Sequence, residues 1–237
     1  MRPQGYYDRP DPNHAPIEGP FGTIPPLILA LAAAMAVIEV AFSLGATGLV
    51  GGPQAVGWRI AAIEGWSVVP AALDRLMVQW DWPVAGRFLG YPFLHHGPVH
   101  AMFAIALLLA LGKFVGEVLH PLSLVVLLVA STLVGALAYG LGVGANYPLI
   151  GAYPMVYGLI GGFTYLMWLK IGRGGGNRLA AFRLIGVLMA LQLVFGLMFG
   201  GDPAWVADAA GFIAGLVLSP LLAPGGASAF LERMRAR

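Results

Sequence analysis

Gly151-Ala152-Tyr153-Pro154-Met155-Val156-Tyr157-Gly158-Leu159-Ile160-Gly161-Gly162 is the most informative stretch for the fold. It predicts the start of an apolar helix that contains closely spaced glycines. Glycine has no side chain, so Gly158, Gly161 and Gly162 allow a second helix to approach the backbone closely. We therefore expect tight helix packing along this stretch, including its first residue, Gly151.

The composition places the chain among polytopic membrane proteins. Of its 237 residues, 59% are hydrophobic and 10% are charged, and the mean hydropathy is +0.80, which excludes an ordinary soluble protein. Cysteine is absent, so a disulfide framework, a thiolate nucleophile and a cysteine-based metal site are excluded. The expected surrounding is the lipid bilayer, and we expect neither a cofactor nor a nucleic-acid partner.

Six apolar segments are long enough to cross a bilayer, which predicts an all-α bundle of six transmembrane helices. They cover residues 26–49, 99–116, 121–142, 148–169, 184–200 and 204–222. The predicted membrane domain therefore comprises residues 26–224. An extended proline-rich arm, residues 1–25, precedes it, and a basic tail, residues 225–237, follows it.

The longest connection, residues 51–98, is predicted to lie in the membrane interface. It is too polar for the hydrocarbon core, and its tryptophans and arginines are Trp58, Trp66, Trp80, Trp82, Arg59, Arg75 and Arg87. Aromatic rings mixed with arginines are typical of the headgroup region. Two short helices, at residues 58–68 and 71–80, are expected to lie in the interface rather than cross the membrane.

The distribution of basic residues predicts the orientation. Six spans place both termini on one side, and ten Lys and Arg residues then lie on that side against three on the other. The ten are Arg2, Arg9, Lys113, Lys170, Arg173, Arg178, Arg183, Arg233, Arg235 and Arg237, and the three are Arg59, Arg75 and Arg87. Because basic residues concentrate in cytoplasmic segments, both termini are predicted to be cytoplasmic, in a protein of the bacterial inner membrane.

The stretch that begins at Gly151 resembles the nucleophile helix of the rhomboid intramembrane proteases. In that family the segment reads Gly-Ala-Ser-Gly and the serine is the nucleophile, whereas this chain has Tyr153 and Pro154 at the last two positions. A phenol with an unperturbed pKa of about 10 has no evident base to activate it, and proline lacks the backbone N–H that an oxyanion hole uses. The resemblance covers roughly residues 86–222 and implies a rhomboid-like bundle with a long interfacial first loop.

The last span resembles the rhomboid motif His-Leu-Gly-Gly-x-x-x-Gly, with Asp208 at the histidine position and Gly211 and Gly215 retained. A carboxylate cannot act as the neutral imidazole of a Ser–His dyad, and it has no serine to deprotonate. The glycine pair has the small-xxx-small spacing that lets helices approach closely. We therefore expect this helix to pack against the region of Gly158 and Gly161.

At the second span the family shows His-x-x-x-x-His-x-x-x-Asn, and this chain has His95, His100 and Ala104 at those positions. The resemblance assigns the last histidine and the asparagine to oxyanion stabilisation. A methyl group donates no hydrogen bond, so that contribution is lost at Ala104. The family's Trp-Arg pair in the first loop appears here as Gly86-Arg87.

Loss of the nucleophile, the base and an oxyanion donor together predicts a pseudoprotease rather than an enzyme, because the residues of a catalytic unit act together. Inactive relatives of rhomboids bind transmembrane segments of other proteins. The resemblance therefore implies an accessory subunit, scaffold or assembly factor of a membrane protein complex. Two alternatives stay open: an active serine protease with a rearranged site at Ser123 or Ser131, and a transport or retrotranslocation element that thins the bilayer.

The histidines also have a metal-binding interpretation. His96 and His100 are spaced i,i+4 on a helix, and His95 is adjacent. No HExxH pattern is present, however, and the rhomboid motif already explains His95 and His100. The prediction is therefore that no metal is bound.

Three other residues carry structural expectations. Tyr153 and Tyr157 share a helix face and are expected to fill the volume of the former active site, with the Tyr153 hydroxyl paired to Asp208. Glu39 is an acid within the first span, where a charge is costly unless it has a partner. It is either a protonated, hydrogen-bonded structural acid or a contact to a partner's transmembrane helix.

Overall fold

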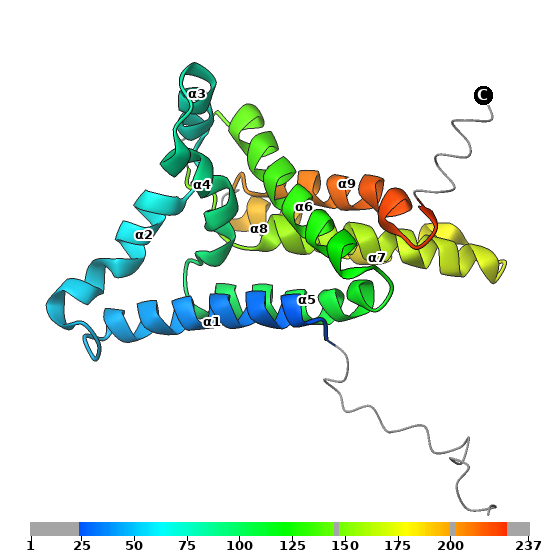
Figure 1. Ribbon diagram of the computed structural model, residues 1–237, viewed down its shortest axis with the longest axis horizontal. Helices are drawn as coiled ribbons and strands as arrows, with labels where there is room; N and C mark the ends of the chain where they lie inside the picture. Colours follow the sequence, from blue (N-terminus) through cyan, green and yellow to red (C-terminus); the bar gives the residue numbers. More distant parts are fainter. Residues whose placement is uncertain (1–23, 145–146, 200–201, 227–237) are drawn as a thin grey trace, which may run out of the picture.

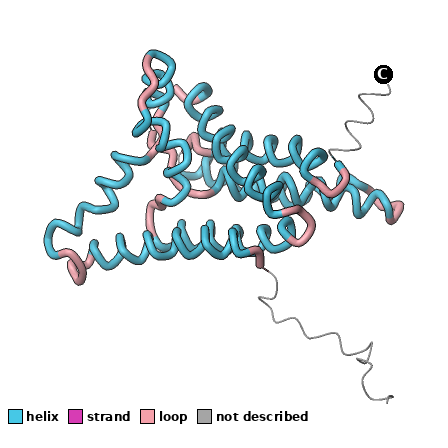
Figure 2. The backbone as a smooth tube through the Cα atoms, in the orientation of Figure 1, coloured by secondary structure: helices cyan, strands magenta, loops and turns pink. Residues whose placement is uncertain are grey.

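The computed structural model describes residues 24–144, 147–199 and 202–226. Within these ranges the chain consists of helices and loops, with one isolated β-bridge (Figure 2). The predicted all-α membrane bundle is therefore confirmed. Nearly all of the predicted basic tail and of the predicted N-terminal arm lies outside the described residues.

Among the described residues, four helices are long and apolar enough to cross a membrane. They are α1 (Pro26–Ala46), α5 (Pro98–Gly116), α6 (Pro121–Gly142) and α9 (Trp205–Leu222). The first three have proline in the first turn, where its missing N–H sacrifices no intrahelical hydrogen bond. These helices agree closely with four of the six predicted spans.

Helices α7 (Tyr153–Arg173) and α8 (Arg183–Phe199) correspond to the other two predicted spans. Every residue from 154 to 162 in α7 is buried, so this helix packs against protein rather than lipid and tolerates its glycines and tyrosines. The helix begins later than the predicted residue 148. A short 3₁₀ helix, η3 (Arg178–Phe182), leads into α8, whose predicted end at Gly200 lies outside the described residues.

The first loop is itself largely helical. Its elements are η1 (Gly52–Gly57), α2 (Trp58–Trp66), α3 (Pro70–Val78), α4 (Trp82–Gly90) and η2 (Tyr91–Phe93). The two predicted short helices are present as α2 and α3, whereas α4 was not predicted. Figure 1 shows these three helices running from the C-terminal end of α1 towards the end of α6.

Two clusters of buried apolar residues hold the bundle together. The first joins α1, α5, α6 and α7 through residues such as Ile28, Met35, Leu108, Leu127 and Leu159. The second joins the first loop to α6 and α9 through Val68, Leu73, Tyr91, Tyr139 and Ala207. The first loop is thus part of the packed structure.

The isolated bridge fixes the first loop beside the entrance of α7. Val68 and Leu149 exchange both backbone hydrogen bonds, at 3.2 and 2.8 Å. The buried hydroxyl of Tyr91 donates to the carbonyl of Thr132 in α6 at 2.9 Å. These contacts hold the first loop against α6 and against the segment that precedes α7.

Candidate functional site

The entrance of α7 depends on Gly151. Its φ of +98° lies in the left-handed region that favours glycine, and its N–H donates to the carbonyl of Tyr91 at 3.1 Å. A Cβ at this position would lie 2.9 Å from Cε1 of His100. The turn presents Tyr153 and Pro154 as the first two residues of α7.

Tyr153 occupies the space beside His100. The two rings are stacked, with centroids 4.9 Å apart and planes inclined by 24°. The Tyr153 hydroxyl donates to the carbonyl oxygen of His100 over a long distance of 3.4 Å. The aromatic ring of Tyr153 therefore packs on the His100 ring, and its hydroxyl bonds to the backbone.

The predicted hydrogen bond between Tyr153 and Asp208 is wrong. Asp208 lies in α9 and is 3% exposed, and its Oδ2 accepts a hydrogen bond of 2.6 Å from Nε2 of Gln192 in α8. Its Oδ1 has no hydrogen-bond partner among the described residues. The reason is that α8 supplies an amide to the carboxylate, while the Tyr153 hydroxyl is directed at α5.

Sequence reasoning missed Gln192. The signal was present, because Gln192 is the one amide side chain in the otherwise apolar predicted span at 184–200. A polar side chain within a membrane helix usually faces the bundle and a polar partner. Asp208 was the obvious candidate partner on the next helix.

Three histidines lie together beside the first turn of α7: His100 stacks on Tyr153, and His95 and His96 lie next to His100. His95, between η2 and α5, is 1% exposed, and neither of its ring nitrogens has a hydrogen-bond partner in the described part of the chain. The centroids of the His95 and His96 rings lie 5.4 and 5.2 Å from that of His100, whose Nδ1 accepts from the backbone N–H of His96 at 3.3 Å. Burial lowers the pKa of His95 to about 4, so its imidazole is neutral at pH 7. No group of three or more His, Cys, Asp or Glu residues within the described ranges is arranged to hold a metal ion.

Helices α7 and α9 meet backbone to backbone, and they run alongside each other in Figure 1. A Cβ added to Gly211 would collide with the carbonyl oxygen of Pro154, and one added to Gly215 would collide with the carbonyl oxygen of Gly158. A Cβ on Gly161 would collide with the backbone of α9 in turn. Gly161, Gly211 and Gly215 therefore lie at the contact between these two helices, and Gly215 lies directly against the backbone of Gly158.

Residues 84–225, more than half of the chain, match the rhomboid domain. The chain belongs to the rhomboid family. It is thus an integral membrane protein with a rhomboid-like helical bundle, from a family that includes serine proteases. No curated protein matches the sequence.

The resemblance to the rhomboid motifs predicts the nucleophile, base and oxyanion positions at Tyr153, Asp208 and Ala104. The side chain of Ala104 in α5 is 0% exposed and supplies only a methyl group. Pro154 has no N–H, and its carbonyl is covered by Gly211. The structure places the ring and the backbone carbonyl of His100 directly against Tyr153.

The two serines of the alternative protease hypothesis lie on α6. Ser131 is 0% exposed and packs so closely on α7 that its Oγ would collide with a Cβ on Gly158. Its hydroxyl has no hydrogen-bond partner among the described residues. Ser123 is in the first turn of α6, and the nearby His120 caps that helix by accepting from the Leu122 N–H at 3.3 Å.

Gly162 of α7 lies between α6 and α9, with Leu127 of α6 and Ser219 of α9 as neighbours.

Glu39 has its partners within the chain. Its carboxylate receives two hydrogen bonds from the Arg59 guanidinium, at 2.7 and 2.9 Å, and one from the Ser43 hydroxyl at 3.1 Å. Arg59 also donates to the carbonyl of His95 at 2.7 Å and lies over the Phe42 ring. Both interpretations of Glu39 from the sequence missed this ion pair, because Arg59 is twenty residues away on α2.

Proposed function

We propose that this rhomboid-family chain is catalytically inactive and binds transmembrane segments of partner membrane proteins, as an accessory subunit, scaffold or assembly factor of a membrane complex. We place it in the bacterial inner membrane with both termini in the cytoplasm, on the basis of the charge distribution. Partner binding uses the same bundle shape with which proteases of the family receive their substrates.

The observation that carries this proposal is the contrast between the replaced chemistry and the retained packing. Tyr153 stacks on His100 where the family has its nucleophile, and Asp208 bonds to Gln192 where it has its base. The close contact between α7 and α9 is nevertheless kept through Gly211 and Gly215. Selection for hydrolysis does not explain this combination, whereas selection for the shape of the bundle does.

Helix α8 offers a suitable surface for a partner helix. Val187, Leu191, Val194 and Met198 follow one another at spacings of four, three and four residues, and they are 59%, 49%, 50% and 68% exposed. Residues at this spacing form an apolar seam along one side of a helix, and helices pack against each other through such seams. The polar side chain of Gln192 points to Asp208 instead, which leaves the seam apolar.

Co-purification tests the proposal. The tagged full-length chain is isolated from membranes in a mild detergent, and the bound membrane proteins are identified by mass spectrometry. The wild-type chain is expected to capture a specific membrane protein, and Leu191→Ala with Val194→Ala is expected to reduce that capture several-fold. The matched control is Val37→Ala with Val40→Ala, on the exposed apolar face of α1. Absence of any captured membrane protein above an untagged sample would contradict the proposal.

A further inference from the structure

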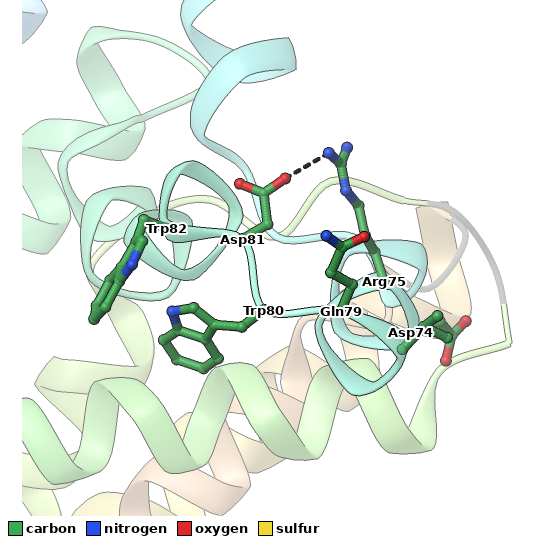
Figure 3. A pocket seen from close by; sticks show the side chains of 7 residues that line it. Asp74, Arg75, Gln79, Trp80, Asp81 and Trp82 are labelled. Atoms are coloured by element: carbon green, nitrogen blue, oxygen red, sulfur yellow. Dashed lines mark ion pairs between the residues drawn. The ribbon is translucent and has the colours of Figure 1, made fainter.

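A second candidate site lies in the first loop, apart from the former catalytic positions. A hollow of about 640 Å³ opens between α3 and α4, a volume that suits a small ligand group (Figure 3). Helix α3 packs against the C-terminal end of α6, where Leu73 contacts Gly140. Because α6 is one of the membrane-crossing helices, the hollow lies level with the end of a span, where lipid headgroups are found.

The hollow carries charges of both signs. The Arg75 guanidinium and the Asp81 carboxylate form an ion pair of 2.5 Å at its edge, which the dashed line in Figure 3 marks. The Arg75 side chain is 66% exposed, so most of its five N–H groups are free to donate to another acceptor. Asp74, next to Arg75 on the same helix, is exposed and forms no ion pair with any residue that the structure describes.

Two tryptophans form the other wall. The rings of Trp80 and Trp82 meet edge to face, with centroids 5.2 Å apart and planes inclined by 87°. They are 59% and 76% exposed, and Val78 beside them is 90% exposed. Tryptophan at a membrane surface typically sits at headgroup level, and its ring face attracts cations.

We propose that this hollow binds the headgroup of phosphatidylethanolamine. Arg75 donates to the phosphate, and the ammonium group donates to Asp81 beside the rings of Trp80 and Trp82. Asp74, which points away from Asp81 in Figure 3, adds negative charge to the hollow without contacting the ammonium group. Guanidinium pairs well with phosphate, and a primary ammonium has three N–H donors for carboxylates. Val78 and the tryptophan rings contact the first part of the acyl chains.

The same residues argue against the other common headgroups. A purely anionic lipid would bring a net negative charge to the carboxylates of Asp74 and Asp81 without offering them a cation. The trimethylammonium of phosphatidylcholine has no N–H to donate to Asp81. A water-soluble phosphoethanolamine would leave Val78 and Trp82 in contact with water.

Lipid retention on the full-length chain tests this proposal. The purified, delipidated protein is incubated with an equimolar mixture of phosphatidylethanolamine, phosphatidylcholine and phosphatidylglycerol with the same acyl chains. Bound lipids are then counted by native mass spectrometry. We expect phosphatidylethanolamine to be retained roughly tenfold more than either competitor, and Arg75→Gln and Asp81→Asn each to abolish the preference.

The matched control is Arg87→Gln, another first-loop arginine, whose guanidinium donates to the Glu64 carbonyl at 3.2 Å outside the hollow. It should keep the preference. Because Asp81 also caps α4, Asp74→Asn provides a second acidic variant that leaves this cap intact. Equal retention of the three lipids, a preference for phosphatidylglycerol, or a preference that survives both Arg75→Gln and Asp74→Asn would overturn the proposal.

Discussion

At the residue scale, restoring the serine alone does not restore an active site. Tyr153→Ser supplies an alcohol, but position 208 offers a carboxylate already bonded to Gln192, and Ala104 offers no donor. We expect no cleavage of a rhomboid-type transmembrane substrate and no labelling by a serine-reactive fluorophosphonate. Tyr153→Phe is the control for loss of the hydroxyl, whose bond of 3.4 Å is too long to contribute much. Labelling of Ser at position 153 would show that a base is present after all.

The buried ion pair of Glu39 and Arg59 gives a second prediction at this scale. Their side chains are 9% and 19% exposed, so Arg59→Met leaves an unpaired carboxylate and should lower the free energy of unfolding by about 3 kcal/mol. Glu39→Gln with Arg59→Met should be less destabilising than the sum of the two single changes. Thermal unfolding in detergent measures this, with Arg75→Gln as an exposed-pair control that should cost under about 1 kcal/mol. If the loss of unfolding free energy in the double variant equals the sum of the losses in the two single variants, the two side chains are not coupled.

These residues also show what sequence could and could not predict about the site. The motifs predict Tyr153, Asp208 and Ala104 as site positions, because each motif is a fixed spacing along one segment of the chain. Their partners were not located: the hydroxyl of Tyr153 bonds to a backbone carbonyl, and Asp208 bonds to Gln192. Such pairings depend on how neighbouring helices are rotated about their axes and shifted along them. A spacing within one helix does not determine either quantity.

At the element scale, the contact between α7 and α9 predicts the effect of a larger side chain at Gly211. The atoms that a Cβ would meet there belong to the backbone of Pro154, which cannot move aside. Gly211→Leu should therefore lower the free energy of unfolding by about 1–3 kcal/mol, the usual cost of overpacking. The matched control is Gly186→Leu in α8, where a Cβ meets nothing within 4 Å. Equal thermal stability of the two variants in detergent would contradict this packing.

Helix boundaries were predictable where proline marks them, as at Pro26, Pro98 and Pro121. The start of α7 was predicted at residue 148, five residues early, because the left-handed turn at Gly151 separates residue 148 from the helix. Helix α4 was missed because it has only nine residues and no long apolar run. Asp81 followed by Pro83 is nevertheless a helix N-terminal signal, and Asp81 caps α4.

At the scale of the whole molecule, the charge distribution predicts which end of the bundle faces the cytoplasm. The absence of cysteine makes the chain suitable for single-cysteine labelling. Gln54→Cys is in the exposed part of η1, and Gly174→Cys caps the end of α7, where a Cβ would have its nearest neighbour at 3.7 Å. A membrane-impermeant maleimide applied to intact spheroplasts should label Gln54→Cys strongly and Gly174→Cys only after the membrane is opened. The reason is that Lys170, Arg173 and Arg178 surround Gly174, and basic segments of this kind are retained in the cytoplasm. The reverse pattern of labelling would invert the bundle and place the hollow at Arg75 on the inner leaflet.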